Sequence, residues 1–517
     1  MVYLPTKVKL PFLWGKAVFK KDTWTHINLI VGPNGSGKTL LAQSIAQQFG
    51  KAGYSVKFLK AERDSVSSEE ETVSILRTNE EVRNKVQSVL SSMFGKSIVF
   101  KEHEHSLIPV VINRAWNVEY NLQEVECHGL REIITLLVVL YANTGNTCIV
   151  FDEPELHLHP QFQHFFAEEL RRVSKRHPKR MYFLITHSPF FIDVRFPEEM
   201  KGVIVCHTNR EPTHIDVLDN RDEELLRRFL PRFNTYHKQF FFSDNQVFVE
   251  GYTDQQLFTN LLPYVHTDRG IAGTGIIDVG GKDELGVFCK VCALLGTNSR
   301  IITDLDSLFS GKLRDVFCAD ERTAVWLERQ LPKQEKFLKT VFTVKELSKH
   351  LSLEKLIVRL EQYLAVVGRE LCNYAESKHK QKIPNALSLL IEKLTALDLK
   401  HDNAENIDTF KTVTLQGVMQ LDKKLASVLT EQSAQSLSAI KNLFAIILAA
   451  TAAADVFILP RGCIEHYYTQ NDIQYMPVSA KDRLFHTELE HLLLSNAKEI
   501  QKDYAELIDI LESACAR

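Results

Sequence analysis

The sequence lacks a strong excess of charge of either sign, a long apolar run and any low-complexity tract. Its 517 residues include 62 Lys and Arg and 65 Asp and Glu, which gives a formal net charge of −3 at pH 7. This balance provides no overall electrostatic attraction to nucleic acid, although a local basic groove is compatible with it. No stretch approaches the roughly 20 apolar residues of a membrane span. We therefore expect a cytoplasmic protein without a membrane partner.

Cysteine is also sparse, with nine residues at irregular spacing. This pattern is typical of free thiols in a reducing compartment rather than of a disulfide framework. Cys289 and Cys292 form a Cys-x-x-Cys pair in an apolar, helix-like segment. With no second pair nearby, this pair favours packing in a core over a metal site. No cluster of Cys and His has the spacing of a zinc-binding module. A primase would be expected to carry such a module, so its lack argues against that class of enzyme.

A glycine-rich motif lies near the N-terminus. Residues 31–39 read Val-Gly-Pro-Asn-Gly-Ser-Gly-Lys-Thr and match the P-loop pattern G-x-x-x-x-G-K-[ST]. The apolar run 26–31 predicts a strand before the loop, and residues 40–49 predict a helix after it. Backbone N–H groups of such a loop converge on phosphate oxygens. The predicted ATP-binding residues of the loop are Gly32, Asn34, Gly35, Ser36, Gly37, Lys38 and Thr39.

Within this set, two side chains have predicted roles of their own. Lys38 would reach the β- and γ-phosphates, and the Thr39 hydroxyl would ligate Mg²⁺. Residues 148–153, Cys-Ile-Val-Phe-Asp-Glu, form an apolar strand that ends in two acids, as in a Walker B motif. There Asp152 would act on Mg²⁺ through the second shell, and Glu153 would polarise the attacking water.

Other segments of the first half have weaker patterns. Residues 1–20 indicate a strand pair, and residues 55–59 indicate a further strand. Apolar positions at helical spacing across 69–93 predict one helix or a helix pair in a lobe inserted into the ATPase core. His157 and His159, which follow Walker B, favour a role in shaping a turn and a subunit contact over metal binding.

The second half indicates a parallel α/β sheet. Residues 246–250 form a strand that ends in Glu-Gly, and a helix begins near Thr253. A second strand leads into the glycine turn of 275–282, and a third ends in Asp-x-Asp at 300–306. Helical stretches such as 283–295 alternate with these strands, as in parallel sheets.

Three acids follow these strands directly. Because the carboxyl ends of parallel strands meet at one edge of the sheet, Glu250, Asp304 and Asp306 are expected to lie together. Crowded carboxylates repel one another unless a divalent cation neutralises them, and hard oxygen ligands favour Mg²⁺ or Mn²⁺. Such a metal activates water for hydrolysis of a phosphate ester. The alternative is a plain α/β domain with surface carboxylates at its strand ends.

The motifs of the first half resemble those of a known group. The P-loop, Asp-Glu-Pro-Glu-Leu-His-Leu-His-Pro and Thr-His-Ser-Pro resemble the ABC-type ATPases of recombination proteins and of the overcoming lysogenisation defect (OLD) group. The resemblance implies that His187 is the switch histidine and that ATP is held between two heads. The signature loop of the partner head would correspond to 126–132, where Gly129 alone is kept and Cys127 or His128 stands in place of serine.

The second half resembles the Toprim domain of topoisomerases, primases and OLD nucleases through its Glu-Gly, Gly-Gly and Asp-x-Asp order. By this resemblance Glu250 is an acid or metal ligand, and Asp304 and Asp306 are metal ligands. Asp254 matches a further acidic position of OLD proteins. No tyrosine lies in the setting of a topoisomerase nucleophile, which argues against a strand-passage enzyme.

A long helical pattern covers residues 320–450, and an apolar strand with Gly-x-x-Glu follows at 455–465. This strand looks like the later strand of an OLD Toprim domain, so the helical block would be an insertion. Glu465 could then serve a second metal, and Lys481 could meet the phosphate or the leaving group. The insertion carries no motif, which favours a dimer or partner surface over a catalytic part.

The predicted fold is α/β, with an ABC-type P-loop ATPase domain followed by a Toprim domain that carries a large helical insertion. The predicted boundaries are 1–238 for the ATPase domain with a helical lobe at about 64–130, 239–318 for the first part of the Toprim domain, 319–452 for the insertion, and 453–517 for the completion of the Toprim domain and a C-terminal helix.

The resemblance implies an ATP-binding and ATP-hydrolysing, metal-dependent endonuclease that acts on DNA and forms a homodimer or higher oligomer through its ATPase heads. It further implies a role in anti-phage defence, with a reverse transcriptase and its small DNA, or a helicase, as partner. The alternative is an ATP-gated scaffold or nucleic-acid-binding protein whose Toprim domain does not cut. The crowded carboxylates argue against that alternative, because a binding module has no need of them near phosphates.

Overall fold

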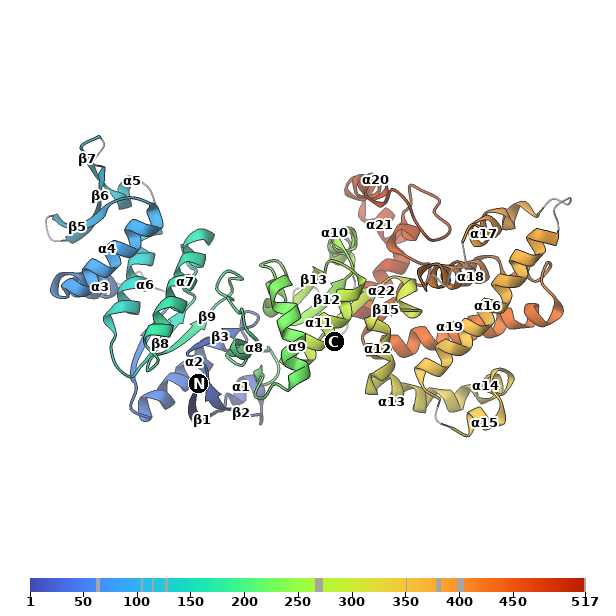
Figure 1. Ribbon diagram of the computed structural model, residues 1–517, viewed down its shortest axis with the longest axis horizontal. Helices are drawn as coiled ribbons and strands as arrows, with labels where there is room; N and C mark the ends of the chain where they lie inside the picture. Colours follow the sequence, from blue (N-terminus) through green and yellow to red (C-terminus); the bar gives the residue numbers. More distant parts are fainter. Residues whose placement is uncertain are drawn as a thin grey trace. The chain divides into compact units, whose positions relative to one another are not determined.

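The computed structural model describes residues 1–61, 66–103, 106–113, 116–125, 129–265, 273–349, 351–377, 383–397 and 404–515. These residues form two compact units (Figure 1). The first comprises residues 1–244 and 294–297, and the second comprises residues 245–293 and 298–517. The chain thus passes from one unit to the other at 244/245, whereas the predicted boundary between the ATPase and Toprim domains is 238/239.

The first unit is built on a six-stranded sheet with the order β11-β10-β3-β9-β8-β4. Its neighbouring strands are parallel except for β10 and β11. Every residue of β8 and β9 is buried, as expected for central strands of a parallel sheet. The strands are β3 (Ile27–Val31), β4 (Ser55–Leu59), β8 (Thr147–Asp152), β9 (Met181–Ile185), β10 (Val203–Val205) and β11 (Thr213–His214).

Helix α2 (Lys38–Lys51) follows the P-loop and packs against this sheet and against β1. The strand pair expected near the N-terminus consists of β1 (Val2–Val8) and β2 (Phe19–Trp24), which are antiparallel and flank α1. Rings of Trp24, Phe49 and Phe183 meet edge to face in the core between these elements. The remaining helices of the unit outside the lobe are α1 (Pro11–Trp14), α6 (Leu130–Ala142), α7 (Pro160–Arg176), α8 (Pro197–Met200), α9 (Asn220–Phe229), η1 (Leu230–Arg232) and η2 (His237–Phe242).

The lobe between β4 and α6 is not purely helical, so the prediction of a helical lobe is wrong in this respect. It begins with the helix pair α3 (Val66–Thr78) and α4 (Glu80–Phe94), where Asn79 caps α4 by accepting from the Val82 N–H. An antiparallel three-stranded sheet follows, because the β-branched residues of 98–113 pair in register across a hairpin. Its elements are β5 (Ile98–His103), β6 (Ser106–Asn113), β7 (Val118–Asn121) and the short helix α5 (Leu122–Val125).

The second unit contains a four-stranded, fully parallel sheet with the order β13-β12-β14-β15. Its strands are β12 (Asn245–Val249), β13 (Thr274–Asp278), β14 (Arg300–Thr303) and β15 (Val456–Ile458). Helices α10 (Tyr252–Leu261), with η3 (Leu262–Tyr264), and α11 (Lys282–Leu295) connect the first three strands. Since β15 pairs with β14, the long helical block between them is an insertion in one sheet.

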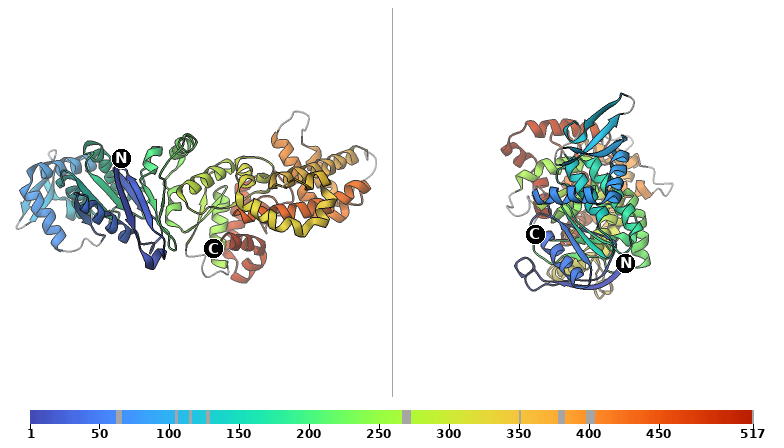
Figure 2. Two further views of the ribbon diagram at one scale, coloured as in Figure 1. Left: turned by 90° about the horizontal axis from the view of Figure 1, so that it is seen from below. Right: turned by 90° about the vertical axis from the view of Figure 1, so that its left-hand side faces the viewer.

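The insertion is a helical body, coloured yellow to orange in Figures 1 and 2. Helices α16 and α18 both pack against α19, and α19 also packs against β15 of the sheet. Its helices are α12 (Lys312–Ala319), α13 (Glu321–Gln330), η6 (Leu331–Gln334), α14 (Glu335–Val341), α15 (Val344–Leu347), α16 (Leu353–Ser377), α17 (Asn385–Thr395), α18 (Ala404–Leu425) and α19 (Glu431–Ala453).

Helix α19 corrects one expectation from the sequence. By length and composition it is apolar enough to cross a membrane, the one such helix found among the described residues. The core helix of a soluble protein has the same properties, so this helix is weak evidence for a membrane span. Here 44% of the apolar window is buried, and the helix packs against α13, α16 and α18.

The chain after β15 ends in three helices, whereas one amphipathic helix or two were expected over residues 484–514. Asn496 starts a new helix by accepting from the N–H groups of Lys498 and Glu499, and Tyr504 breaks the helical path again. Helix α22 packs against β12 and β14 of the four-stranded sheet. The elements of this part are η7 (Ile464–Tyr467), α20 (Lys481–Leu494), α21 (Ala497–Asp503) and α22 (Ala505–Cys515).

Candidate nucleotide and metal sites

The P-loop connects β3 to α2 and needs glycine at two positions. Gly32 has φ of +143°, and a Cβ there would clash with the backbone carbonyl of Cys206. Gly37 has φ of +82°, and a Cβ there would clash with the side chain of Leu13. Both residues therefore keep the loop close to its neighbours in a conformation that other residues rarely adopt.

The middle of the loop presents its backbone to solvent. Asn34 and Gly35 are exposed, and Gly35 has φ of +76°. Ser36 is buried and donates its hydroxyl to the Pro33 carbonyl at 2.8 Å, which tightens the turn. The exposed residues leave this part of the loop accessible, as phosphate binding by backbone N–H groups requires.

Lys38 lies over this loop. Its Nζ donates to the carbonyls of Gly32 at 3.1 Å and Pro33 at 2.8 Å, and burial lowers the pKa of Lys38. Carbonyl oxygens are weak partners for a buried ammonium compared with phosphate oxygens. The Thr39 hydroxyl donates to Asp152 Oδ1 at 3.2 Å, which is the pairing expected of the two residues that hold Mg²⁺ beside a nucleotide.

Glu153 and His187 face each other across the same edge of the sheet. Glu153 has φ of +47°, in the left-handed region, and its N–H donates to the Ile185 carbonyl at 2.9 Å. His187 Nε2 lies 3.9 Å from Glu153 Oε1. Burial, with the charge of Lys38, lowers the pKa of His187 to about 4, so the ring is neutral at pH 7. A neutral imidazole can accept or donate a hydrogen bond without repelling Lys38.

The segment that carries His187 is held by Glu155, a residue of the quoted motif that received no role from the sequence. Glu155 accepts from the His187 N–H at 2.6 Å and from the Thr186 hydroxyl at 2.9 Å. Burial raises the pKa of Glu155, and these donors oppose that rise. Glu155 thus holds the backbone of His187, which was predicted to be the switch histidine.

Gly129 and the two histidines after Walker B have packing roles. A Cβ at Gly129 would clash with the His157 carbonyl, and Gly129 begins α6 as its N-cap. His157 has φ of +63° in the turn, and His159 Nδ1 accepts from the Gln161 N–H at 3.3 Å at the start of α7. Residues 126–128 of the predicted signature loop, with Cys127 and His128, lie outside the described residues.

In the second unit, three predicted acids meet at the carboxyl edge of the sheet. Glu250 follows β12, and Asp304 and Asp306 follow β14; one carboxylate oxygen of each lies within 4.8 Å of the others. Glu250 Oε1 accepts from the Thr303 hydroxyl at 2.6 Å and from the Asp304 N–H at 2.9 Å. The parallel pairing of β12 and β14 therefore places the ends of these two strands side by side, and with them Glu250 and Asp304.

The electrostatics of this cluster favour the binding of a cation. Burial raises the pKa of Glu250, and the charge of Asp306 adds to the rise. Burial and the charges of Glu250 and Asp254 raise the pKa of Asp304 well above its usual value. Asp306 Oδ1 is buried and has no hydrogen-bond partner among the described residues. A divalent cation would relieve the repulsion and take up that oxygen, so the residues fit Mg²⁺ or Mn²⁺.

Asp254 and Glu465 form a second acidic part beside the first. Asp254 Oδ2 accepts from the Gly251 N–H at 3.1 Å; burial, with the charges of Glu250 and Glu465, raises the pKa of Asp254 to about 7. Glu465 is 1% exposed, and its Oε1 lies 3.0 Å from Lys481 Nζ.

Two further properties of this acidic part bear on its chemistry. Glu465 Oε2 is buried without a hydrogen-bond partner among the described residues, which leaves it open to a cation or a donor. Burial opposes the charge of Lys481, but the charges of Glu465 and Asp304 outweigh burial and raise the pKa of Lys481. Lys481 is therefore an ammonium at neutral pH.

Comparison with known families identifies domains in both halves of the chain. Residues 241–306 match the family described as "Overcoming lysogenization defect protein-like, TOPRIM domain", residues 77–192 match the "AAA ATPase domain", and residues 28–119 match the "ATPase family associated with various cellular activities". The chain contains an ATPase domain and an OLD-like Toprim domain.

Two relatives of this chain carry the name nuclease. The chain is 26% identical over 198 residues to the OLD nuclease of Thermus scotoductus, covering 36% of this chain and 34% of the relative. It is 23% identical over 197 residues to the Old nuclease of Escherichia phage P2, covering 35% and 33%. The match thus spans about a third of the length of each relative. The SMC head domain from Thermotoga maritima aligns with a TM-score of 0.27 and 13% identity, covering 40% of this chain and 95% of that chain.

The OLD-like Toprim domain contains one charged residue of the site that the sequence interpretation missed. Lys282 Nζ lies 2.9 Å from Asp306 Oδ2. The preceding turn has Gly280 at φ of +78° and Gly281 at φ of +135°, and the Gly281 N–H donates to the Glu250 carbonyl at 2.7 Å. The signal was present, because Gly-Gly-Lys was recognised as a turn, but only the turn was interpreted.

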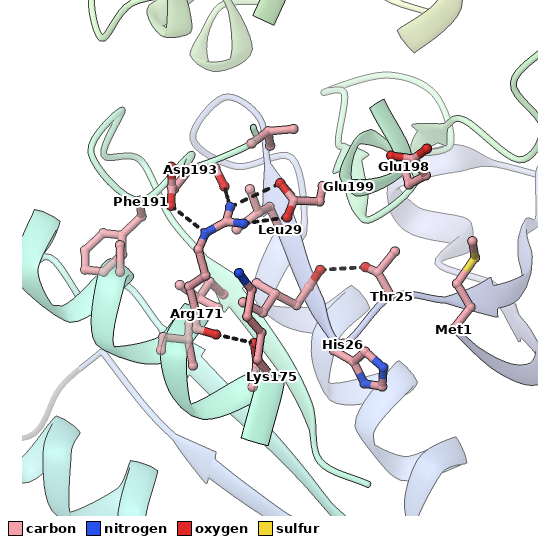
Figure 3. Close-up of a pocket in the computed structure, with 16 residues that line it drawn as sticks. Met1, Thr25, His26, Leu29, Arg171, Lys175, Phe191, Asp193, Glu198 and Glu199 are labelled. Atoms are coloured by element: carbon pink, nitrogen blue, oxygen red, sulfur yellow. Dashed lines mark hydrogen bonds and ion pairs between the residues drawn. The ribbon is translucent and has the colours of Figure 1, made fainter. Parts of the chain in front are cut away.

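The ATPase domain also contains a cavity of about 250 Å³ between β3, α7 and residues 191–199, which none of the predicted site residues lines. Figure 3 shows the Arg171 guanidinium beside Asp193 and Glu199 in this cavity. Arg171 Nε donates to Asp193 Oδ2 at 2.8 Å and Nη2 donates to Glu199 Oε2 at 3.1 Å. The main cation of the cavity is therefore already paired within the protein.

Proposed function

We propose that this protein is an ATP-binding and ATP-hydrolysing endonuclease that cuts DNA with Mg²⁺ or Mn²⁺. The observation that supports the proposal best is the convergence of Glu250, Asp304 and Asp306 at the ends of two parallel strands, with an unpartnered buried oxygen on Asp306. A protein that only binds nucleic acid gains nothing from three mutually repelling acids at a site meant for phosphates.

In the Toprim domain, Glu250, Asp304 and Asp306 would hold one cation, and Asp254 and Glu465 would contribute to a second. A bound cation supplies an activated water and stabilises the charge that develops on the phosphate. Thr303 and the Asp304 N–H fix the Glu250 carboxylate through the hydrogen bonds described above. Lys481 carries a positive charge beside Glu465 and would meet the phosphate or the leaving oxygen.

In the ATPase domain, the loop 32–37 would cradle the phosphates of ATP, and Lys38 would exchange its carbonyl partners for phosphate oxygens. Thr39 and Asp152 would hold Mg²⁺. Glu153 would polarise the attacking water, and the neutral His187 would contact the γ-phosphate, held in place by Glu155. Gly129 would contribute from a partner head.

Assembly and cellular role extend this proposal. ATPase heads of this type support a homodimer or a higher homo-oligomer. The eight cysteines among the described residues are all free thiols, which supports a cytoplasmic location. A role in anti-phage defence, with a reverse transcriptase and its small DNA or a helicase as partner, rests on the family resemblance alone.

The test is cleavage of plasmid and linear DNA with Mg²⁺ or Mn²⁺, with and without ATP. We expect the wild type to cut and Asp304→Ala with Asp306→Ala to lose cutting while ATP binding is kept. The matched control is Asp315→Ala with Asp509→Ala, which removes two exposed acids outside the cluster. Cutting by the Asp304/Asp306 variant would show that the site is misassigned. Absence of cutting by the wild type under every nucleotide condition would favour an ATP-gated scaffold.

A further inference from the structure

One buried amide of the helical insertion reaches into the Toprim domain. Gln416 lies on α18 and is 1% exposed. Its Nε2 donates to the Arg461 carbonyl at 2.6 Å and lies 3.1 Å from Nε2 of His466. Its Oε1 accepts from the Met476 N–H at 3.1 Å. A single side chain of the insertion thus contacts three points of the chain after β15.

These three points surround the second acidic part of the site. Arg461 precedes Glu465 by four residues and His466 follows it directly, so both contacts fix the loop that carries Glu465. Met476 lies on the segment that leads to Lys481, the first residue of α20. Glu465 and Lys481 meet at 3.0 Å. The Gln416 amide therefore contacts both segments that carry this ion pair, the loop of Glu465 and the segment that leads to Lys481.

The same loop is joined to the first acidic part. Gly462 has φ of +137°, and a Cβ there would clash with Gln416 Nε2. The loop therefore needs glycine at this position to pass so close to the amide. The Gly462 carbonyl accepts from the Leu305 N–H at 2.7 Å. Leu305 stands between Asp304 and Asp306, so a shift of this loop would also move the Asp-x-Asp turn.

Helix α18 is itself fixed in place. A Cβ at Gly417, the neighbour of Gln416, would lie 2.6 Å from the Leu390 side chain of α17, which shows how closely the two helices pack. On the side of the Asp-x-Asp turn, Lys411 Nζ lies 5.7 Å from the ring centre of Phe309. A rigidly packed helix is a suitable support for a residue that positions others.

We propose that Gln416 is a positioning residue of the Toprim site, which makes the helical insertion part of the catalytic unit. This inference rests on the proposed nuclease function. Gln416 acts through Glu465 and Lys481, since its hydrogen bonds end on the chain around them. Its loss would leave the Arg461 carbonyl and the Met476 N–H unpaired and would release the loop. Partners of this kind around a metal site typically contribute about 10- to 100-fold to metal affinity or activity.

The experiment compares Gln416→Met with wild type and with the matched control Gln420→Met. Methionine keeps the length of the side chain but removes its hydrogen bonds. Gln420 lies one turn further on α18, is exposed, and donates to the Gln474 carbonyl at 3.3 Å. The readouts are DNA cleavage at varied DNA and Mn²⁺ concentrations and Mn²⁺ binding measured by electron paramagnetic resonance without DNA.

For Gln416→Met we expect kcat to fall by about 10- to 100-fold and the half-saturating Mn²⁺ concentration to rise by about tenfold. The KM for DNA should stay within about twofold, because the amide does not face the substrate. Gln420→Met should behave as wild type in every readout. A folded Gln416→Met with wild-type Mn²⁺ binding and kcat would overturn the inference, even if its melting temperature were lower.

A second variant covers the case in which Gln416→Met does not fold. Gln416→Glu keeps the shape of the side chain and can still accept from the Met476 N–H, but it places an acceptor against the Arg461 carbonyl. It should show the same loss of Mn²⁺ affinity and kcat, and a wild-type result for a folded Gln416→Glu would equally overturn the inference. A wild type that neither binds Mn²⁺ nor cuts DNA would instead remove the proposed function itself.

Discussion

A lysine at the first position of a helix is placed against the helix dipole, and Lys282 occupies that position in α11. Its charge is compensated by Asp306, with Nζ and Oδ2 2.9 Å apart. The same carboxylate carries the unpartnered oxygen of the proposed metal site. The ammonium therefore holds the other oxygen of this carboxylate, beside the proposed metal site, and its positive charge competes with that of a cation for Asp306.

This competition gives a prediction. Lys282→Met should bind Mn²⁺ more tightly than wild type, by about 3- to 10-fold, because the metal no longer meets an ammonium charge beside Asp306. About 1 kcal/mol is the usual scale of such a partly exposed ion pair. The measurement is Mn²⁺ titration without DNA. Lys312→Met is the matched control, since Lys312 is the exposed first residue of α12. Weaker Mn²⁺ binding by Lys282→Met would show that the lysine supports the metal site rather than competing with the metal.

At the residue scale, the sequence predicted the site residues that directly follow strands of the parallel sheet. Glu250, Asp304 and Asp306 were expected together because each follows a strand of a parallel sheet, and the structure brings them together. Glu155 and Gln416 were missed because their partners lie 32 and 60 residues away along the chain. Contacts at that separation depend on packing between elements, which no local pattern describes.

At the scale of elements, the segment between η7 and α20 has little regular structure and depends on one buried acid. Glu488 on α20 is fully buried and accepts from the N–H and the hydroxyl of Thr469 at 2.7 and 3.0 Å, and from the Gln470 N–H at 3.1 Å. The Tyr504 hydroxyl also donates to it. One carboxylate thus ties the chain after Glu465 to both α20 and the start of α22.

Glu488→Leu should destabilise the second unit by about 3 to 5 kcal/mol, because several buried donors lose their acceptor at once. Urea unfolding followed by a probe in the second unit measures the change. Glu490→Leu is the control on the same helix, where the side chain is exposed and the expected change is below about 0.5 kcal/mol. Equal stability of the two variants would show that the donors of Glu488 find water instead.

Elements with a clear apolar run or helical spacing were predictable. The strands at 27–31 and 55–59 and the helices of the insertion follow from apolar runs and helical spacing. The sheet β5-β6-β7 was overlooked, because its strands of six, eight and four residues lie in a segment whose preceding helices dominate the pattern. The C-terminal helix divides into three at Ser495 and Tyr504, where capping by Asn496 and tertiary packing decide the break.

At the scale of the whole molecule, the residues of the two predicted sites lie in different units. All the described residues assigned to ATP lie within 1–244, and all those assigned to the metals of the Toprim domain lie within 245–293 and 298–517. The placement of a helical block between β14 and β15 was indicated by the sequence, since a late apolar strand implied an insertion. The extent of cooperation between the units could not be derived, because it depends on contacts and assembly that no motif specifies.

This division leads to a prediction for ligand binding. ATP at about 100 times its Kd should stabilise the first unit by about 2.7 kcal/mol, and Mn²⁺ should stabilise the second. Hydrogen exchange read by mass spectrometry separates the two, because protected peptides report the unit from which they come. In Lys38→Ala the ATP-dependent protection of the loop 32–39 should be lost and the Mn²⁺-dependent protection around Glu250 kept. Lys51→Ala, on the last turn of the same helix, should retain both. Protection of the loop by ATP in Lys38→Ala would contradict the P-loop assignment, because the Lys38 ammonium, which donates to the Gly32 and Pro33 carbonyls, is the group expected to bind the phosphates of ATP.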